Sequence, residues 1–219
     1  MAKKKQHSLN RRNAGKRLTR DRILIITEGE TESAYFDALR RHYRISTVEC
    51  MVMPSGKGTS PQNIVDYAES LILNGFMNNQ KLLFPSKSFE KVFVVFDEDN
   101  DPSARLAALN RVKELSGKYR TQERQPIEFI AVDSVPNFEI WFLLHYECLH
   151  PQKMLPADSV ARLKRHVPDY VKPMPKMFDR TREKIEFACD RAEKLLNNRN
   201  RQKGDVCTNV YSVVRLLLR

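Results

Sequence analysis

The sequence predicts an α/β fold in which a parallel sheet carries helices on both faces, followed by a mostly helical C-terminal extension. Strand-like and helix-like apolar patterns alternate over residues 22–146, an order typical of a parallel sheet covered by helices. Residues 91–96 (KVFVVF) are apolar on both faces of the expected strand, as in the middle of such a sheet. Residues 155–219 show helical patterns, the longest over residues 180–197.

The first half of the expected core consists of two strand–helix units. Residues 22–27 (RILIIT) are a short β-branched run, long enough for a buried strand and too short for a helix. Residues 31–43 follow as a helix because their apolar side chains recur at helical spacing. Residues 47–53 alternate as a second strand, and the segment PSGKGTSP is a loop by composition. The helix over residues 61–73 begins with a proline, which suits its first turn.

The second half of the expected core repeats this alternation. Residues 91–96 are the clearest strand, residues 102–115 a helix, and residues 127–132 a further strand. The apolar segment over residues 137–145 (NFEIWFLLH) completes the series as a helix. Residues before the first strand are polar, basic and without period, which favours disorder. We therefore divide the chain into a disordered basic arm (1–21), an α/β core (22–146) and a helical C-terminal extension packed on the core (147–219).

The charge of the chain points to a polyanionic partner. The 219 residues carry a net charge of +11, which favours nucleic acid. Residues 1–22 hold nine Lys/Arg and one acid, residues 23–146 hold thirteen and seventeen, and residues 147–219 hold sixteen and nine. A negative centre between positive ends fits a carboxylate metal site with phosphate-binding flanks. The plainer alternative is a solvated basic tail on an ordinary protein.

The cysteines and the hydropathy of the chain indicate the cellular compartment in which the protein is expected. Cys50, Cys148, Cys189 and Cys207 are far apart and form no CxxC pair, so neither a zinc site nor a disulfide framework is expected. No apolar run reaches the length of a membrane span, and no apolar stretch follows the basic N-terminus as in a secretory signal. We expect reduced thiols in a cytoplasmic protein that does not enter a membrane.

Acidic side chains follow two of the expected strands. Glu28 comes directly after the first strand, and Asp97 and Asp99 come just past the strand over residues 91–96. Sites in open α/β sheets form beyond the carboxyl ends of the strands, so neighbouring strands would bring these carboxylates together. A divalent cation relieves their mutual repulsion. Oxygen ligands with open positions suit Mg²⁺ or Mn²⁺, and such an ion can activate water or polarise a phosphodiester.

The spacing within both acidic motifs supports a shared site. Glu32 lies four residues after Glu28, on the first turn of the expected helix, so it can point back to the same place. Between them, Gly29 allows a tight turn and the close approach of a phosphate. Asp97 and Asp99 share a face in extended backbone, and the residue between them points away. For two further acids, Glu30 and Asp101, we favour simple helix capping.

Five sequence segments together carry a family resemblance. They are IITEGETESAYFDAL (25–39), VVFDEDN (94–100), SVPNFEIWFLLHY (134–146), DYVKPMP (169–175) and TNVYSVV (208–214). A strand ending in Glu-Gly with a later strand ending in Asp-x-Asp resembles the Toprim fold of topoisomerases, primases and nucleases of the overcoming-lysogenization-defect type. Over about residues 22–219 the chain resembles the RloB-like family, which implies a Toprim-like core.

The resemblance implies an activity and a set of ligands. RloB-like proteins are bacterial or archaeal and are linked to restriction and phage-defence loci, often beside an ABC-type ATPase. Toprim nucleases of this kind cut DNA or, in related defence effectors, transfer RNA. By the same resemblance, Glu28, Asp97 and Asp99 match the Toprim metal triad. Glu32 matches the second acid of nuclease-type members, which would allow a second ion. The implied protein is an Mg²⁺-dependent endonuclease.

Further side chains are candidates for supporting roles. Lys172 in the YVKP segment and Lys57 in the SGKG loop can neutralise phosphate or stabilise a transition state. Glu139 stands in a very apolar helix, so we expect it to be buried and paired or to face the site; stabilising the helix N-terminus is the simpler alternative. The nucleic-acid-binding candidates, which a solvated basic surface explains equally well, are Lys16, Arg17, Arg20, Arg180, Arg182, Arg191 and Lys194.

Three functions remain open from the sequence. The first is a metal-dependent nuclease of DNA or RNA in phage defence. The second is a non-catalytic nucleic-acid-binding subunit of an ATPase-containing defence complex, in which the basic flanks dominate. The third is a nucleotidyl or phosphoryl transferase, although SGKG lacks the spacing of a nucleotide-binding P-loop. The sequence also leaves open whether the chain forms a homo-oligomer.

Overall fold

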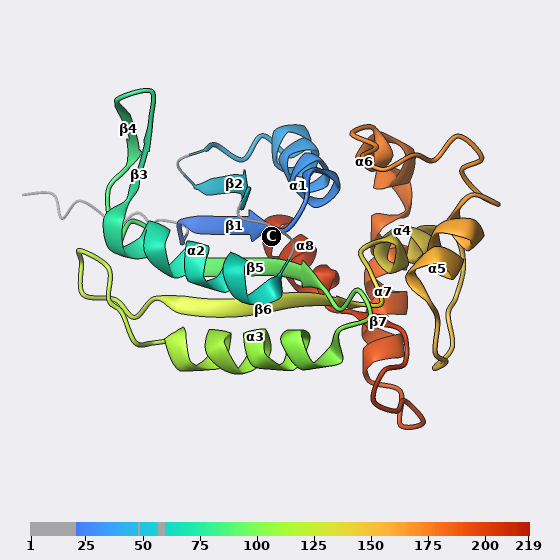
Figure 1. Cartoon of the computed structure of the whole chain (residues 1–219). Coiled ribbons are helices and arrows are strands. Elements are labelled where there is room, and N and C mark those ends of the chain that lie inside the picture. The colour runs from blue at the N-terminus through green and yellow to red at the C-terminus, as the bar shows by residue number, and fades with distance from the viewer. Residues whose placement is uncertain (1–20, 48, 57–59) are drawn as a thin grey trace, which may run out of the picture.

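The computed structural model of the chain describes residues 21–47, 49–56 and 60–219 (Figure 1). It confirms the α/β core and its alternation of strands and helices. The arm expected over residues 1–21 lies outside the described residues apart from Asp21. The core elements are β1 (Ile23–Thr27), α1 (Glu30–His42), β2 (Cys50–Pro54), α2 (Pro61–Asn74), β5 (Lys91–Asp97), α3 (Pro102–Leu115), β6 (Glu128–Val135) and α4 (Glu139–Tyr146).

The main sheet has the strand order β2-β1-β5-β6-β7. Its first four strands are parallel, as predicted, and β1 pairs with β5 from Ile23 opposite Lys91 to Thr27 opposite Val95. The last strand, β7 (Cys207–Thr208), was not predicted and runs antiparallel to β6. Asn209 fixes it there, because its side chain accepts the N–H of Asp133 at 2.8 Å and donates to the carbonyl of Ala131 at 3.0 Å.

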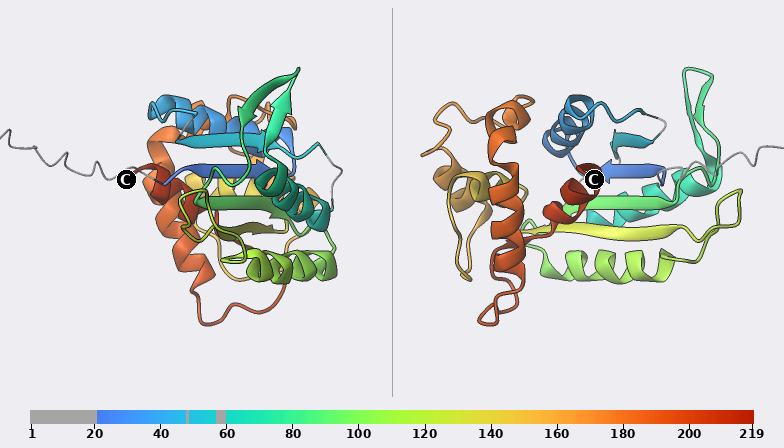
Figure 2. Two further views of the ribbon diagram at one scale, coloured as in Figure 1. Left: turned by 90° about the vertical axis from the view of Figure 1, so that its left-hand side faces the viewer. Right: turned by 180° about the vertical axis from the view of Figure 1, so that it is seen from behind.

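Helices cover both faces of this sheet because the side chains of its strands alternate between two cores. On β1, Leu24 and Ile26 join one core with α2 and α3. Ile23 and Ile25 join the other, which contains residues of α1, α4 and the C-terminal helices. Figure 2 shows the sheet between these layers, with α2 and α8 (Val210–Leu217) on opposite faces. Both faces of the central strands are therefore buried from solvent.

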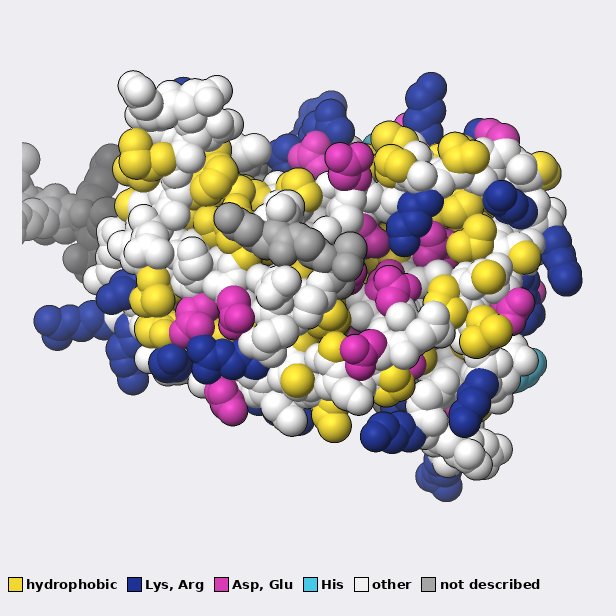
Figure 3. Space-filling model, viewed as in Figure 1, with side chains coloured by type: hydrophobic (Ala, Val, Ile, Leu, Met, Phe, Trp, Pro, Cys, Tyr) yellow, Lys and Arg dark blue, Asp and Glu magenta, His cyan; other side chains and the backbone are white. Residues whose placement is uncertain are grey.

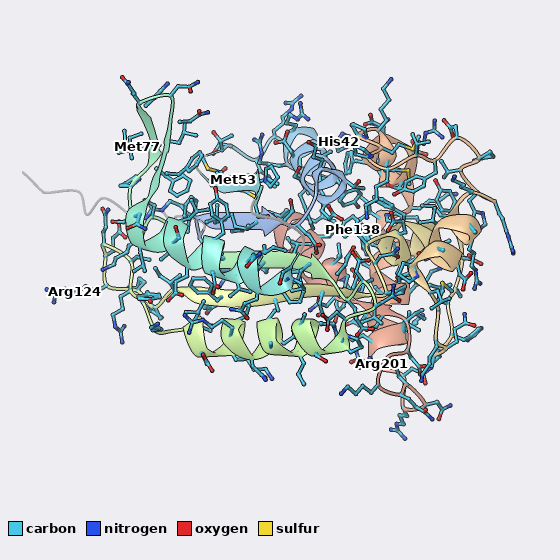
Figure 4. The ribbon with its side chains drawn as sticks, in the orientation of Figure 1. His42, Met53, Met77, Arg124, Phe138 and Arg201 are labelled. Atoms are coloured by element: carbon cyan, nitrogen blue, oxygen red, sulfur yellow. The ribbon has the colours of Figure 1, made fainter. Side chains whose placement is uncertain are left out.

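A small hairpin, which was not predicted, projects from the core (Figure 1). Strands β3 (Phe76–Asn78) and β4 (Lys81–Phe84) pair antiparallel around Asn79 and Gln80, both at positive φ. Three- and four-residue strands are too short to show a period, and the turn lacks the glycine that usually marks such hairpins. Met77, labelled in Figure 4, is 61% exposed.

The C-terminal extension is helical, as expected, but is more divided than predicted. The helix expected over residues 180–197 is interrupted: α6 (Met177–Thr181) and a 3₁₀ turn, η1 (Arg182–Lys184), precede α7 (Ile185–Leu196). The Thr181 hydroxyl donates to the carbonyl of Met177 at 2.7 Å, a local bond that competes with regular helix. With α5 (Pro156–Leu163) and α8, these helices share one hydrophobic cluster with α1 and α4. No helix in the described ranges is long and apolar enough to cross a membrane.

Candidate functional site

The ends of β1 and β5 bring Glu28 beside Asp97. The two strands are parallel neighbours, so their carboxyl ends reach the same edge of the sheet. The backbone N–H of Glu28 donates to the carbonyl of Val95 at 3.1 Å, which extends the strand pairing by one residue. The backbone N–H of Asp97 in turn donates to the Glu28 carboxylate Oε2 at 3.2 Å. Glu28 and Asp97 therefore lie side by side at one edge of the sheet, as predicted.

Glu32 approaches the same place from the first turn of α1. Its side chain is only 3% exposed, and a Cβ placed on Gly29 would lie 2.7 Å from its Oε2. The backbone of Gly29, with φ of −124°, is ordinary extended chain. The expected tight turn is thus not the reason for a glycine here. Instead, the missing side chain leaves space for the Glu32 carboxylate.

The turn after β5 is held by the turn that precedes α4. The N–H of Phe138 donates to Asp97 Oδ2 at 3.0 Å, and the N–H of Asp99 donates to the carbonyl of Pro136 at 3.0 Å. Asp99 is exposed and has a positive φ of 42°. The prediction that Asp97 and Asp99 share a face of extended backbone is wrong in this detail, because β5 ends at Asp97. A turn, not a strand, places the second aspartate.

A buried glutamate and a lysine form the other side of the site. Glu139, on the first turn of α4, is fully buried. It accepts a hydrogen bond from the Tyr170 hydroxyl at 2.8 Å, and the ammonium of Lys172 lies 3.5 Å from the same oxygen. Glu139 is thus buried and paired, as one of the two expectations had it. Tyr170 and Lys172 belong to the segment between α5 and α6.

The carboxylates of this group perturb one another. Burial, helped by the charges of Asp99 and Glu32 and opposed by the Asp97 N–H, raises the pKa of Glu28 to about 7. Burial, with the repulsion of Glu32, raises the pKa of Asp97 well above its usual range. The pKa values of Glu32 and Asp99 are also raised, mainly by burial. Burial lowers the pKa of Lys172, but the surrounding carboxylates outweigh this and raise it.

We call these six residues the acidic cluster: Glu28, Glu32, Asp97, Asp99, Glu139 and Lys172. In the space-filling view, Asp and Glu side chains gather in a hollow between the sheet and the C-terminal helices (Figure 3). Phe138, whose backbone holds Asp97, lies at the same junction in Figure 4. The cluster contains five carboxylates and one cation, so its negative charge is only partly balanced from within.

The oxygen atoms of the acidic cluster fit a hard divalent cation. Glu32 Oε2, Asp97 Oδ1 and Glu139 Oε2 are buried without a hydrogen-bond partner, which is costly unless something else satisfies them. Carboxylate oxygens are the ligands that Mg²⁺ and Mn²⁺ prefer. However, no three His, Cys, Asp or Glu side chains among the described residues already stand as a complete ligand set. Binding an ion therefore requires these side chains to rotate toward it.

The remaining predicted residues are either outside the described part of the chain or away from the acidic cluster. Lys57, Lys16, Arg17 and Arg20 fall outside the described residues. Arg180 forms an ion pair with Asp169, and Arg191 donates to the carbonyl of Leu144 at 2.8 Å. Arg182 and Lys194 are exposed. None of these basic residues contacts the acidic cluster in the part of the chain that is described, so their predicted contact with nucleic acid stays a prediction.

Two acids beside the cluster have structural roles. Asp101 caps α3, since its carboxylate accepts the N–H groups of Ser103 and Ala104 at 3.1 and 2.9 Å. Glu98 points away, as predicted, and lies 3.4 Å from the guanidinium of Arg105. The capping role favoured for Glu30 is not observed, because Gly29 is the N-cap residue and Glu30 is the first residue of α1.

Sequence reasoning missed the two groups that organise the site. Tyr170 stands two residues before Lys172 in DYVKPMP, a spacing that puts both on one side of an extended segment; this signal was available. The sequence gives no such signal for the Phe138 N–H, because every residue except proline has a backbone N–H donor. His145, at the end of α4, is buried, and burial lowers its pKa to about 4.

Fold and site together define an α/β protein with a carboxylate cluster at the carboxyl edge of a parallel sheet. The chain matches the RloB-like protein family over residues 23–217. It therefore belongs to the RloB-like family, as its motifs indicated. No curated protein and no solved structure shows a significant match to it.

Proposed function

We propose that this chain is a divalent-metal-dependent nuclease of the Toprim type, which hydrolyses phosphodiester bonds of DNA or RNA with Mg²⁺ or Mn²⁺. One observation carries the proposal. Glu28 and Asp97 meet at the ends of neighbouring parallel strands, linked by a 3.2 Å hydrogen bond. Buried carboxylate oxygens without partners lie beside them on Glu32 and Asp97. Family membership and the net charge of +11 are consistent with it.

Each side chain of the acidic cluster has a defined task in this proposal. Glu28, Glu32, Asp97 and Asp99 are the groups that would hold one or two ions. When bound, the ion supplies an activated water and polarises the phosphodiester. Lys172 is partly exposed and has a raised pKa, so its ammonium can meet the phosphate charge as it develops. Glu139 positions that lysine, because the Lys172 ammonium lies 3.5 Å from its Oε1, and the Tyr170 hydroxyl donates a hydrogen bond to the same oxygen.

The biological setting follows from the resemblance to family members. We propose that the protein acts in the cytoplasm of a bacterium or archaeon in defence against phages, with transfer RNA as one substrate class. An ABC-type ATPase encoded nearby is the proposed partner. A homo-oligomer is compatible with this setting.

The decisive experiment measures cleavage and folding in the same preparations. Purified protein is incubated with plasmid, single-stranded DNA and total transfer RNA, in Mg²⁺, Mn²⁺ or EDTA. Metal-dependent cleavage is expected for the wild type and is expected to disappear in Glu28→Gln and Asp97→Asn. Glu30→Gln is the matched control, because Glu30 is exposed and only two residues from Glu28. Circular dichroism establishes that all variants fold. Cleavage that persists in a folded Asp97→Asn variant would exclude the proposed site.

Two observations favour a second function. Lys172 already supplies a positive charge to Glu139, and the described residues contain no ready set of three ligands. A non-catalytic nucleic-acid-binding subunit would need no metal ion at these carboxylates. Thermal melting against Mg²⁺ distinguishes the two, because a bound ion stabilises the folded chain by about 2.7 kcal/mol at 100 times its Kd. A melting temperature that does not change when Mg²⁺ is added favours the non-catalytic subunit.

A further inference from the structure

Two cavities flank the N-terminus of α5, on the side of the molecule next to the acidic cluster. Each has a volume of about 570 Å³. They share three wall residues, Lys153, Met154 and Asp158, so they adjoin each other. We call the two adjoining cavities together the α5 trench. It is large enough to receive an extended segment of another molecule.

One end of the α5 trench reaches the loop that carries the catalytic candidates. Glu98 and Asn100, the two chain neighbours of Asp99, line the first cavity together with Pro102 at the start of α3. The opposite wall of that cavity contains Lys203 and Gly204, from the loop after α7. The first cavity therefore begins at the same turn that carries Asp99.

The available charge in the α5 trench is positive. Lys153 and Lys203 are exposed, and within the described part of the chain neither forms an ion pair. The charge of Glu98 is balanced by Arg105 at 3.4 Å. Asp158 remains as an acid in the shared wall, in the first turn of α5, where the helix N-terminus stabilises it. Figure 3 shows Lys and Arg side chains gathered on this side of the molecule.

The second cavity adds further positive charge. Arg165 is exposed there and has no ion pair among the described residues. Arg162 is occupied by Glu147, which accepts from its Nε at 2.7 Å. Free cations thus occur along the α5 trench, at Lys203, Lys153 and Arg165. A row of this kind suits a chain of phosphates better than a single anion.

Apolar side chains stand among these cations. Leu155 is 61% exposed, and Met154 beside it is partly exposed. The face of an unpaired base is apolar and stacks or packs on such surfaces, whereas a duplex hides its base faces. The combination of spaced cations with an exposed leucine therefore favours a single strand as the occupant.

We propose that the α5 trench binds a single strand of DNA or RNA on one side of the phosphodiester to be cut. Lys153 and Lys203 contact phosphates, and Leu155 contacts a base. This inference rests on the proposed nuclease function. It assigns the substrate path to residues other than the nucleic-acid-binding candidates named from the sequence.

The test is a binding measurement that needs no catalysis. Fluorescence anisotropy in EDTA gives the affinity for labelled single-stranded DNA, single-stranded RNA and duplex DNA over a range of salt. The variant is Lys153→Ala/Lys203→Ala. The control is Lys81→Ala/Lys113→Ala, which removes the same charge from exposed positions on the hairpin and on α3. The salt slope is the dependence of the logarithm of the affinity on the logarithm of the salt concentration. Losing two phosphate contacts is expected to reduce its magnitude by about 1.4 and to lower the affinity about 25-fold at about 0.1 M salt. The control is expected to change neither by more than a small fraction of this.

The outcomes separate this inference from the proposed function. Equal effects of the trench variant and its control would overturn the trench, even if metal-dependent cleavage is found. A specific loss in the trench variant, with no cleavage by the wild type, would support the trench and count against the nuclease. Leu155→Ser is expected to weaken single-strand binding while leaving the salt slope unchanged. A preference for duplex that the trench variant abolishes would overturn the assignment to a single strand.

Discussion

Replacing Glu28 by glutamine is expected to stabilise the metal-free protein at neutral and alkaline pH. Burial raises the pKa of this carboxyl from its ordinary 4.5 to about 7. The folded chain therefore holds a proton that the unfolded chain releases between these values. Stability is lost as the pH rises from 4.5 through 7, because the folded state must then accept a charge among other carboxylates. Glutamine removes that charge and still offers an oxygen to the Asp97 N–H.

The size of the effect follows from the two pKa values. The interval between 4.5 and about 7 corresponds to about 3.4 kcal/mol at about 1.36 kcal/mol per pH unit. Glu28 is only partly buried, so water screens its carboxylate and about half of this, ~1.5 kcal/mol, is the realistic gain. For a chain of this length, that gain raises the melting temperature by about 3 to 6 °C.

Urea denaturation in EDTA measures this gain directly. The wild type, Glu28→Gln and the exposed control Glu30→Gln are compared at about pH 5 and about pH 8. The two Gln variants should be alike at the lower pH, and Glu28→Gln should be more stable at the higher. The other carboxylates of the acidic cluster leave some pH dependence in every variant, so the difference between variants is the measured quantity. Equal stability of wild type and Glu28→Gln at the higher pH would refute the reasoning.

Three further predictions concern Gly29, Arg105 and His145. Gly29→Ala places a Cβ 2.7 Å from Glu32 Oε2; it should shrink the stabilisation by Mg²⁺ in thermal melts, while metal-free stability changes by less than about 1 kcal/mol because the glutamate can swing away. Arg105→Ala leaves the buried Asp133 without its cation and should cost about 3 kcal/mol in urea, whereas a cost near zero would show that the pair is not needed. Burial lowers the pKa of His145 to about 4, so stability should fall by up to about 3 kcal/mol as the pH drops from 6.5 to 4; His145→Asn should flatten this limb of the pH profile.

The core and the position of the acids were predictable because both depend on short patterns. The run over β5 is apolar on both faces, which occurs in the middle of a parallel sheet. If β1 and β5 are neighbouring parallel strands, their carboxyl ends lie at the same edge of the sheet. Glu28 and Asp97, at those ends, are then expected to lie close together. The helix start after Gly29 then places Glu32 by helical spacing. The strands and the helix start are predicted from residues close in sequence, and only the pairing of β1 with β5 draws on the expected fold class.

The parts that sequence reasoning missed depend on contacts between distant segments. Strand β7 has two residues and exists because Asn209 bonds to the backbone of β6. The Tyr170 hydroxyl reaches Glu139 across 31 positions of the chain. No local period encodes these contacts, so they appear only when the whole chain is folded.

The balance of charge at the edge of the sheet connects stability with function. Five carboxylates surround one ammonium in a partly buried place, and this destabilises the folded chain unless protons or a cation compensate. Near neutral pH a divalent ion removes two charges where a lysine removes one. A protein that only bound nucleic acid would be more stable with amides at Glu28 and Asp97, and its affinity would rise with the added positive charge. Carboxylates that weaken the metal-free fold and oppose phosphate binding are instead what the proposed ion-dependent hydrolase requires.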